Sequence, residues 1–151
     1  MNAGNTLFQT TVMKTNEWIT DLMNTLDLPD EHKALRALRA ALHTIRDHVP
    51  ANEAVALGAQ LPALVRGLYY EGWRLTDRPP RLHSHDELMG LLRRELGPDP
   101  ALDPESVLRA VMRVLHRHVS AGELRHLAMT TSRPLASIWG SELGLPASTR
   151  Y

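Results

Sequence analysis

The chain contains an internal repeat, in which two stretches of twenty residues align without a gap. The first stretch, LRAALHTIRDHVPANEAVAL, begins at Leu38, and the second, LRAVMRVLHRHVSAGELRHL, begins at Leu108. Eight of the twenty aligned positions are identical, and apolar residues pair at others, such as Leu42 with Met112. Self-similarity of this kind predicts two matching structural units, while it says little about chemistry. The identical pairs are Leu38/Leu108, Arg39/Arg109, Ala40/Ala110, His48/His118, Val49/Val119, Ala51/Ala121, Glu53/Glu123 and Leu57/Leu127.

The spacing of apolar residues predicts that both units are helical. Along nearly the whole chain these residues recur every three or four positions, as on one face of an α-helix, and strand-like alternation is nearly absent. We therefore predict an all-α fold with about eight helices, arranged as two pseudo-repeated four-helix units packed into one compact domain. The expected buried stripes are Phe8, Val12, Thr15, Ile19, Leu22 and Leu26 in the first helix, then Leu35, Leu38, Leu42, Ile45 and Val49, and then Leu108, Val111, Met112, Leu115 and Val119.

Capping residues and prolines mark where the helices begin. Ser84 with Glu87 matches a capping box, in which a serine or threonine and a glutamate or glutamine three residues later cap the first turn. Thr6 with Gln9 offers a similar start for the first helix. The breaks divide the chain into an N-terminal tail (1–6), a first helical repeat (7–73), a linker (74–83), a second helical repeat (84–140) and a flexible C-terminal tail (141–151).

Composition limits the classes of function. Acidic and basic residues number 17 each, so no net charge draws the chain to nucleic acid or to an anionic membrane. The chain has no cysteine, which excludes disulfides and thiolate metal sites and fits a reducing compartment. The first residues, MNAGNTLFQ, lack the pattern of a signal peptide, and no apolar run reaches the roughly 20 residues of a membrane span. We expect a cytoplasmic protein that does not associate with a membrane.

Two short motifs near the middle of the chain resemble those of a bacterial family. They are AQLP, which ends at Pro62, and LYYEGW, which ends at Trp73. Together with the LRAALHTIRDHV helix and the HVSAGE turn, they make the chain resemble the family named domain of unknown function 2267 over residues 7–140. The resemblance implies a small all-helical prokaryotic protein. It implies no reaction, substrate, cofactor or catalytic residue.

The aromatic run at the end of the first repeat is one candidate binding surface. Tyrosine and tryptophan combine a large apolar area with a polar group, and they are common in binding hot spots. The same side chains also fit a wedge between the two units, with Gly72 ending the helix in a left-handed conformation. The candidate partner surface consists of Tyr69, Tyr70, Glu71, Trp73 and Arg74.

Basic residues beside the two repeated stripes form a second candidate site. They recur at equivalent positions in both repeats, so the two rows could face one groove and bind the phosphates of nucleic acid or of a phosphorylated ligand. Alternatively, the arginine stems cover apolar side chains while their head groups stay in water or pair with acids. The candidate anion-binding stripe consists of Arg36, Arg39, His43, Arg46, Arg109, Arg113 and His116.

Histidines offer a third candidate, a metal site. His83 and His85 flank Ser84, and His116 and His118 have the same spacing. Side chains two residues apart on a helix point in different directions, so the second pair is poorly placed to share one ion. His48 and His118 fit helix C-termini instead, where a positive charge is favourable.

The sequence carries no enzyme signature or cofactor motif. A glycine-rich phosphate loop, a GxSxG nucleophile turn and an HExxH zinc motif are all missing. Our first hypothesis is a non-enzymatic helical interaction module that binds a protein partner or a second copy of itself and needs no cofactor. The alternative is binding of nucleic acid or a phosphorylated ligand through the arginine rows, and the third hypothesis is a histidine metal site.

Overall fold

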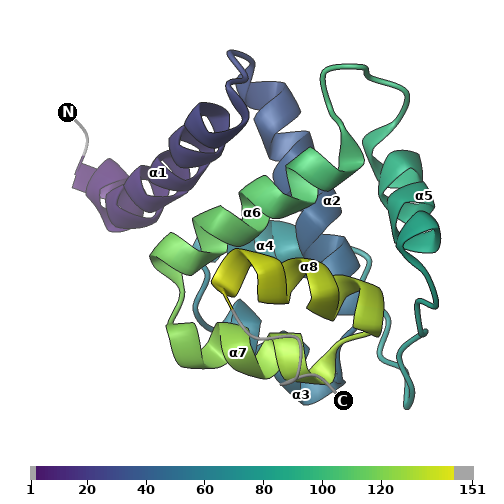
Figure 1. Ribbon diagram of the computed structural model, residues 1–151. Coiled ribbons are helices and arrows are strands. Elements are labelled where there is room, and N and C mark those ends of the chain that lie inside the picture. The colour runs from purple at the N-terminus through teal and green to yellow at the C-terminus, as the bar shows by residue number, and fades with distance from the viewer. Residues whose placement is uncertain (1–2, 145–151) are drawn as a thin grey trace.

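The computed structural model describes residues 3–144, and these residues contain eight α-helices and no β-strand (Figure 1). The predicted all-α class is therefore confirmed. Residues 145–151, which belong to the predicted C-terminal tail, lie outside the described residues. The elements are a 3-10 helix, η1 (Ala3–Phe8), and the helices α1 (Gln9–Leu26), α2 (Glu31–Asp47), α3 (Ala51–Gly58), α4 (Ala63–Tyr70), α5 (His85–Leu96), α6 (Pro104–His118), α7 (Ala121–Thr130) and α8 (Arg133–Leu143).

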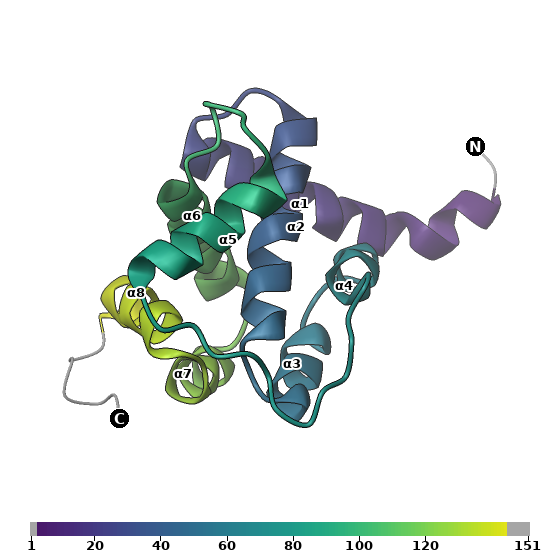
Figure 2. The same ribbon diagram turned by 90° about the vertical axis from the view of Figure 1, so that its right-hand side faces the viewer.

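Helices α2 and α6 pack against each other, and the other helices surround them (Figure 1, Figure 2). Leu38 on α2 and Leu108 on α6 are fully buried in this core. Ala34 and Ala37 are fully buried as well. Their side chains are small, so neighbouring helices can approach α2 closely at these positions and cover them. The predicted stripe of α2 is confirmed except at Leu35, which is 41% exposed. The buried face of the first turns passes through Ala34 and Leu38, so Leu35 points to one side of it.

The helices begin where their capping residues predict, with one exception. The Ser84 hydroxyl accepts a 3.0 Å hydrogen bond from the backbone N–H of Glu87 at the start of α5. Helix α1 begins at Gln9 directly after η1, with Phe8 in the N-cap position and no side-chain cap. The capping box predicted at Thr6 is wrong, because Thr6 lies inside η1. Side chains also cap three further helices, Asp30 for α2, Asp103 for α6 and Ser120 for α7, whereas α3, α4 and α8 have no side-chain cap.

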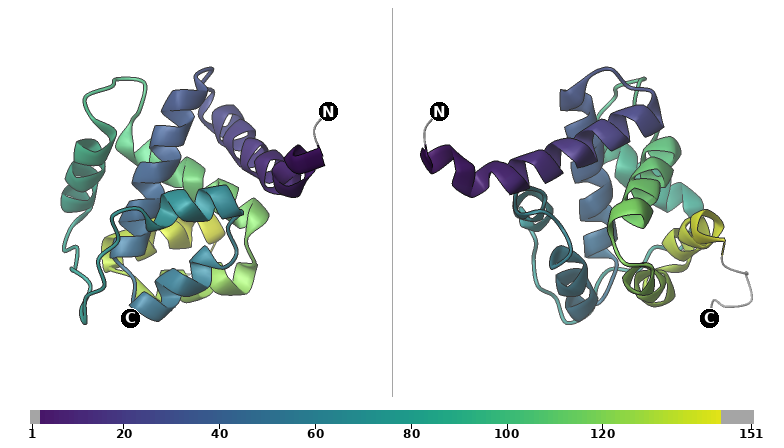
Figure 3. Two further views of the ribbon diagram at one scale, coloured as in Figure 1. Left: turned by 180° about the vertical axis from the view of Figure 1, so that it is seen from behind. Right: turned by 90° about the vertical axis from the view of Figure 1, so that its left-hand side faces the viewer.

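The N-terminal half of α1 projects beyond the rest of the molecule (Figure 2, Figure 3). Trp18 and Leu22, in the C-terminal half, are buried in the core. Phe8 and Val12, at the start of the predicted stripe, are instead 66% and 43% exposed. The stripe prediction is therefore wrong for the first turns of α1, because the helix is longer than the surface on which it packs.

Ring stacking and charged hydrogen bonds fasten the C-terminal half of α1 to α6. The Trp18 ring stacks on His118 with 5.0 Å between the ring centroids. The Arg117 guanidinium donates hydrogen bonds of 2.7 and 2.9 Å to the Asp21 carboxylate, and His118 bonds the same group at 3.0 Å. Partial burial alone would raise the pKa of Asp21. The hydrogen bonds from Arg117 and His118 lower it by a larger amount, so the pKa lies below its ordinary value.

Four of the five identical apolar pairs are buried in both repeats, whereas in the fifth pair Ala51 is partly buried and Ala121 is exposed. One of the three identical polar pairs, His48 with His118, differs in its surroundings. His48 is buried and bonds the carbonyl oxygen of Thr44, whereas His118 lies at the surface against Trp18. A common three-dimensional arrangement of the two units stays a prediction. The buried pairs are Leu38/Leu108, Ala40/Ala110, Val49/Val119 and Leu57/Leu127.

The linker, residues 74–83, contains no helix and connects α4 to α5. It leaves α4, runs down past α3 and crosses the molecule to α5 (Figure 2). Helix α8 continues to Leu143 and ends at Gly144, which has a φ of +72°, so the second helical segment extends past residue 140. None of the helices in residues 3–144 is long and apolar enough to cross a lipid bilayer.

Candidate functional site

The structure divides the predicted partner surface between the core and the solvent. Tyr69 is fully buried, and its hydroxyl donates a 2.6 Å hydrogen bond to a backbone carbonyl of α3. Tyr70 is partly buried, and its ring centroid lies 4.9 Å from that of Tyr69 and 5.5 Å from that of Trp73. Glu71 and Arg74 are exposed, and Trp73 is half-buried. The two tyrosines therefore pack within the first repeat, whereas Trp73 and Arg74 line a surface cavity, and a wedge between the two units stays a prediction.

Arg46 holds the chain in place immediately before Trp73. Its side chain is 5% exposed, and Nη1 donates hydrogen bonds to the carbonyl oxygens of Tyr69 at 2.8 Å and Glu71 at 2.6 Å. Gly72 follows with a φ of +67°, a left-handed conformation that favours glycine. The sequence placed Arg46 in the candidate anion-binding stripe, but its guanidinium is occupied by the C-terminal carbonyls of α4.

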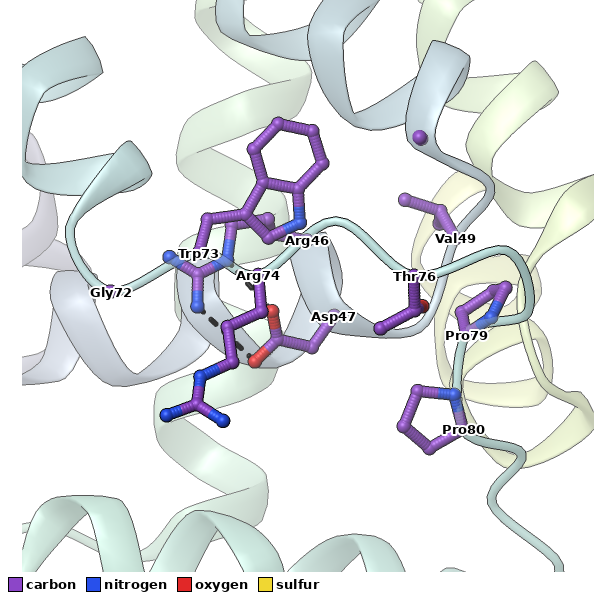
Figure 4. Close-up of a pocket in the computed structure, with 10 residues that line it drawn as sticks. Arg46, Asp47, Val49, Gly72, Trp73, Arg74, Thr76, Pro79 and Pro80 are labelled. Atoms are coloured by element: carbon purple, nitrogen blue, oxygen red, sulfur yellow. Dashed lines mark hydrogen bonds and ion pairs between the residues drawn. The ribbon is translucent and has the colours of Figure 1, made fainter.

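The surface cavity, of about 270 Å³, lies between the C-terminal end of α2 and the linker (Figure 4). The Trp73 indole lies on one side of it, and the rings of Pro79 and Pro80 lie on the other. Arg74 extends away from the indole. The carboxylate of Asp47 is also at this cavity, where it pairs with the buried Arg46. The cavity therefore combines apolar ring surfaces with an unpaired guanidinium at its rim.

Two more hollows continue this cavity along the linker. The first, of about 670 Å³, shares Thr76 and the two prolines with the cavity at Trp73. The second, of about 470 Å³, shares Arg81 and Ser132 with its neighbour and reaches Arg133 at the start of α8. We call the three together the linker groove. It runs along residues 74–83 from Trp73 to Arg133.

The α2 row of the predicted anion-binding stripe has its own partners within the chain. Arg39 pairs with Glu71 at 3.6 Å, and Arg36 pairs with Asp99 at 3.7 Å. His43 donates a 2.8 Å hydrogen bond from Nε2 to a backbone carbonyl near the end of α4. Burial lowers the pKa of His43. This row therefore fastens α2 to α4 and to the loop between α5 and α6.

The α6 row of the stripe is directed at α8. Arg109 and Arg113 both donate to the Glu142 carboxylate, at 3.0 and 2.9 Å. His116 is exposed and, within residues 3–144, its side chain has no hydrogen-bond or charged partner. The two rows thus reach different helices, and the structure does not bring them together in one groove. Their pairing with acids matches the alternative in which the arginine heads are neutralised within the chain.

The histidines are distributed over several elements. Within the described part of the chain, no group of three or more histidine, aspartate or glutamate side chains is placed to hold a metal ion. His85 bonds Glu105 at 2.6 Å across the gap between α5 and α6. His83 is exposed, and its backbone N–H donates to Glu87.

Two glutamates at equivalent positions of the repeat meet where α3 packs on α7. Burial, followed by the nearby charge of Glu53, raises the pKa of Glu123. The Glu123 Oε2 atom is buried and has no hydrogen-bond partner among the described residues. His126 lies 3.5 Å from Glu53 on the solvent side. The alignment already paired Glu53 with Glu123, but their contact depends on how the two segments pack, which the sequence does not contain.

Replacing Glu123 with glutamine is expected to increase the free energy of unfolding at neutral pH by roughly 0.2–1 kcal/mol, the range of one partly exposed charge interaction. The raised pKa means that the folded chain holds this proton more tightly than the unfolded chain does. This proton therefore stabilises the unchanged protein at acidic pH, and that stabilisation is lost as the pH rises through the raised pKa of Glu123. Urea denaturation of both proteins across the acidic to neutral range measures the difference.

The control for this substitution is Glu31→Gln. Glu31 also lies in a first helical turn, so this variant reports the effect of losing a favourable charge at a helix N-terminus alone. The gain from Glu123→Gln, relative to Glu31→Gln, should shrink as the pH falls. A constant difference between the two variants at all pH values would show that burial and the Glu53 charge do not raise the pKa of Glu123.

Comparison of the chain with known protein families identifies the family to which it belongs. A family model described as "Uncharacterized conserved protein (DUF2267)" matches residues 15–137, a range that includes most of α1, all of α2 to α7 and the first turn of α8. No curated protein matches the chain. The matched range contains the AQLP and LYYEGW motifs on which the resemblance was based. The chain therefore belongs to the DUF2267 family of uncharacterized conserved proteins.

Proposed function

We propose that this protein is a non-enzymatic helical interaction module of the bacterial cytoplasm, which binds a protein partner in the linker groove. The observation that carries this proposal is the apolar cavity between Trp73 and the rings of Pro79 and Pro80. Leu75, next to it on the linker, is 73% exposed. Tryptophan in a surface pocket is a common hot spot of protein interfaces. An exposed leucine beside such a pocket enlarges the apolar area that a partner would cover.

The local structure supports the same proposal, because the cavity is largely formed before a partner arrives. The hydrogen bonds from Arg46 hold the chain before Gly72, and the left-handed turn at Gly72 sets the direction of Trp73. Pro79 and Pro80 limit the backbone freedom of the opposite wall. A site that is ordered in advance loses less conformational entropy on binding. The absence of cysteine fits the cytoplasmic location proposed here.

Replacing Trp73 with alanine is expected to weaken partner binding by about 30-fold or more, since truncating a hot-spot tryptophan costs about 2 kcal/mol or more. Cross-linking and pull-down from native extract, followed by titration of the partner against the purified chain, measure the loss. Thr76→Gln places a longer uncharged side chain in the groove without touching the core, because Thr76 is exposed, and it should also weaken binding.

The matched control for that experiment is Phe8→Ala. Phe8 is an exposed aromatic residue at the end of η1, and it does not line the linker groove. This variant should bind the partner as well as the unchanged chain does. Equal binding by Trp73→Ala, Thr76→Gln and the unchanged chain would rule out the linker groove as the partner site.

A second candidate function is self-association through the projecting half of α1. Leu7 and Phe8 at the end of η1 and Val12 and Met13 on α1 are all exposed, and exposed apolar side chains that lie this close together along the chain favour an interaction site. A second copy of the chain offers the same patch, so the two could pack about a two-fold axis. Light scattering at increasing concentration is expected to give the mass of a dimer. A constant monomer mass over the whole range would contradict this candidate.

A further inference from the structure

Unpaired arginines concentrate along the linker groove. Six arginines in residues 3–144 have neither an ion pair nor a side-chain hydrogen bond with another described residue. Four of them line the groove, and the other two, Arg94 and Arg125, lie on α5 and α7. The four are Arg74, Arg78, Arg81 and Arg133.

Acidic side chains do not balance this charge. Two aspartates line the groove, and one of them, Asp47, already pairs with Arg46. The other, Asp77, is therefore the one carboxylate left to offset the charge of the four unpaired arginines that line the groove. The chain as a whole has as many acids as bases, so the positive groove is a local feature and not a consequence of net charge. Such a local excess favours a partner of opposite charge and speeds its approach.

We propose that the linker groove binds an extended acidic segment of a partner protein. An apolar side chain of that segment occupies the cavity between Trp73 and the two prolines, and its carboxylates pair with the arginines that follow towards Arg133. Arginine suits this role because its planar guanidinium donates two parallel hydrogen bonds to a carboxylate. This inference rests on the proposed function and specifies the chemistry of the partner.

The groove favours an acidic peptide over nucleic acid. Proteins that bind single strands combine a basic track with several aromatic side chains on which successive bases stack. Among the described residues that line the groove, Trp73 is the one tryptophan, tyrosine or phenylalanine. The sequence pI of about 7.1 is also below the basic values typical of nucleic-acid-binding domains. The apolar rings at the Trp73 end fit a protein side chain better than a phosphate.

The experiment is selection of peptides from a random display library on the immobilised full-length chain. Enriched peptides should carry several aspartates or glutamates and one large apolar residue. Synthetic copies of these peptides should bind in solution, and Arg78→Glu with Arg81→Glu should weaken that binding by about tenfold or more, since each reversal replaces an attraction with a repulsion. The matched control is Arg94→Glu with Arg125→Glu, which reverses two unpaired exposed arginines outside the groove and should leave binding unchanged.

Two outcomes would overturn the inference and leave the proposed function intact. In one, the enriched peptides bind at the groove, as Trp73→Ala shows, but they carry no acidic excess. In the other, acidic peptides bind the two double variants equally. Tighter binding of a single-stranded oligonucleotide than of the peptides, lost in Arg78→Glu with Arg81→Glu, would also overturn it. Failure to enrich any peptide would contradict the inference and the proposed function together.

Discussion

Replacing Arg46 with alanine is expected to lower the free energy of unfolding by about 3 kcal/mol. The carbonyl oxygens of Tyr69 and Glu71 would lose the charged donor that they now share. A buried acceptor left without a donor costs about 1–3 kcal/mol. In a chain of this size, such a loss lowers Tm by roughly 6–12 °C. Urea denaturation followed by circular dichroism measures the free energy, and a thermal scan measures Tm.

Arg39→Ala is the matched control for that prediction. Arg39 lies on the same helix, and it makes an exposed ion pair with Glu71. Losing such a pair costs less than about 1 kcal/mol. Arg46→Lys should recover only part of the stability, because an ammonium group cannot present the planar fork of a guanidinium. If Arg46→Ala were as stable as Arg39→Ala, the turn before Trp73 would not depend on this side chain.

The second large effect is expected in the core, at one pair of aligned residues. Leu38→Ala and Leu108→Ala should each lower the free energy of unfolding by about 3–5 kcal/mol, because each removes a fully buried side chain and leaves a cavity. If the two repeats pack alike, the two losses should also be similar in size. Denaturant titration of both variants under the same conditions compares them.

Leu35→Ala provides the control on the same helix. Leu35 is partly in water, so its truncation should cost no more than about 0.5 kcal/mol, as is usual for surface positions. Losses at Leu38 and Leu108 that differ by more than about 2 kcal/mol, the spread seen among buried leucines, would show that the two environments are unlike. In that case the sequence repeat would not correspond to a structural one.

The fold class was predictable because the periodicity of apolar residues and the capping residues both act locally. Ser84 caps α5 by accepting a hydrogen bond from the backbone N–H of Glu87, three residues later, so both partners lie within one short stretch of sequence. The errors at Leu35 and at Phe8 and Val12 have a different origin. Periodicity identifies an apolar face, but it does not reveal which part of that face the rest of the chain reaches. The projecting half of α1 is therefore visible only in the structure.

The candidate site was predictable in part. Of the three aromatic residues in the run, only Trp73 lines the surface cavity. Tyr69 is buried because α3 lies against it, and the sequence does not reveal that contact. The arginines illustrate the limit more clearly. Arg46 and Arg78 are the same residue type, yet one is buried among carbonyls and the other is unpaired at a groove. Pairing is a property of tertiary geometry, so the sequence could not indicate that the unpaired charges gather on the linker.

The proposal that a partner occupies the linker groove can be tested with the indole N–H resonances of the three tryptophans. Trp73 lines the groove, Trp18 lies where α1 packs on α6, and Trp139 is buried in the core. Titration with a selected acidic peptide should shift the Trp73 resonance, assigned with Trp73→Phe, and leave the other two in place. A shift of the Trp18 resonance with Trp73 unchanged would place the partner on α1 and contradict the account.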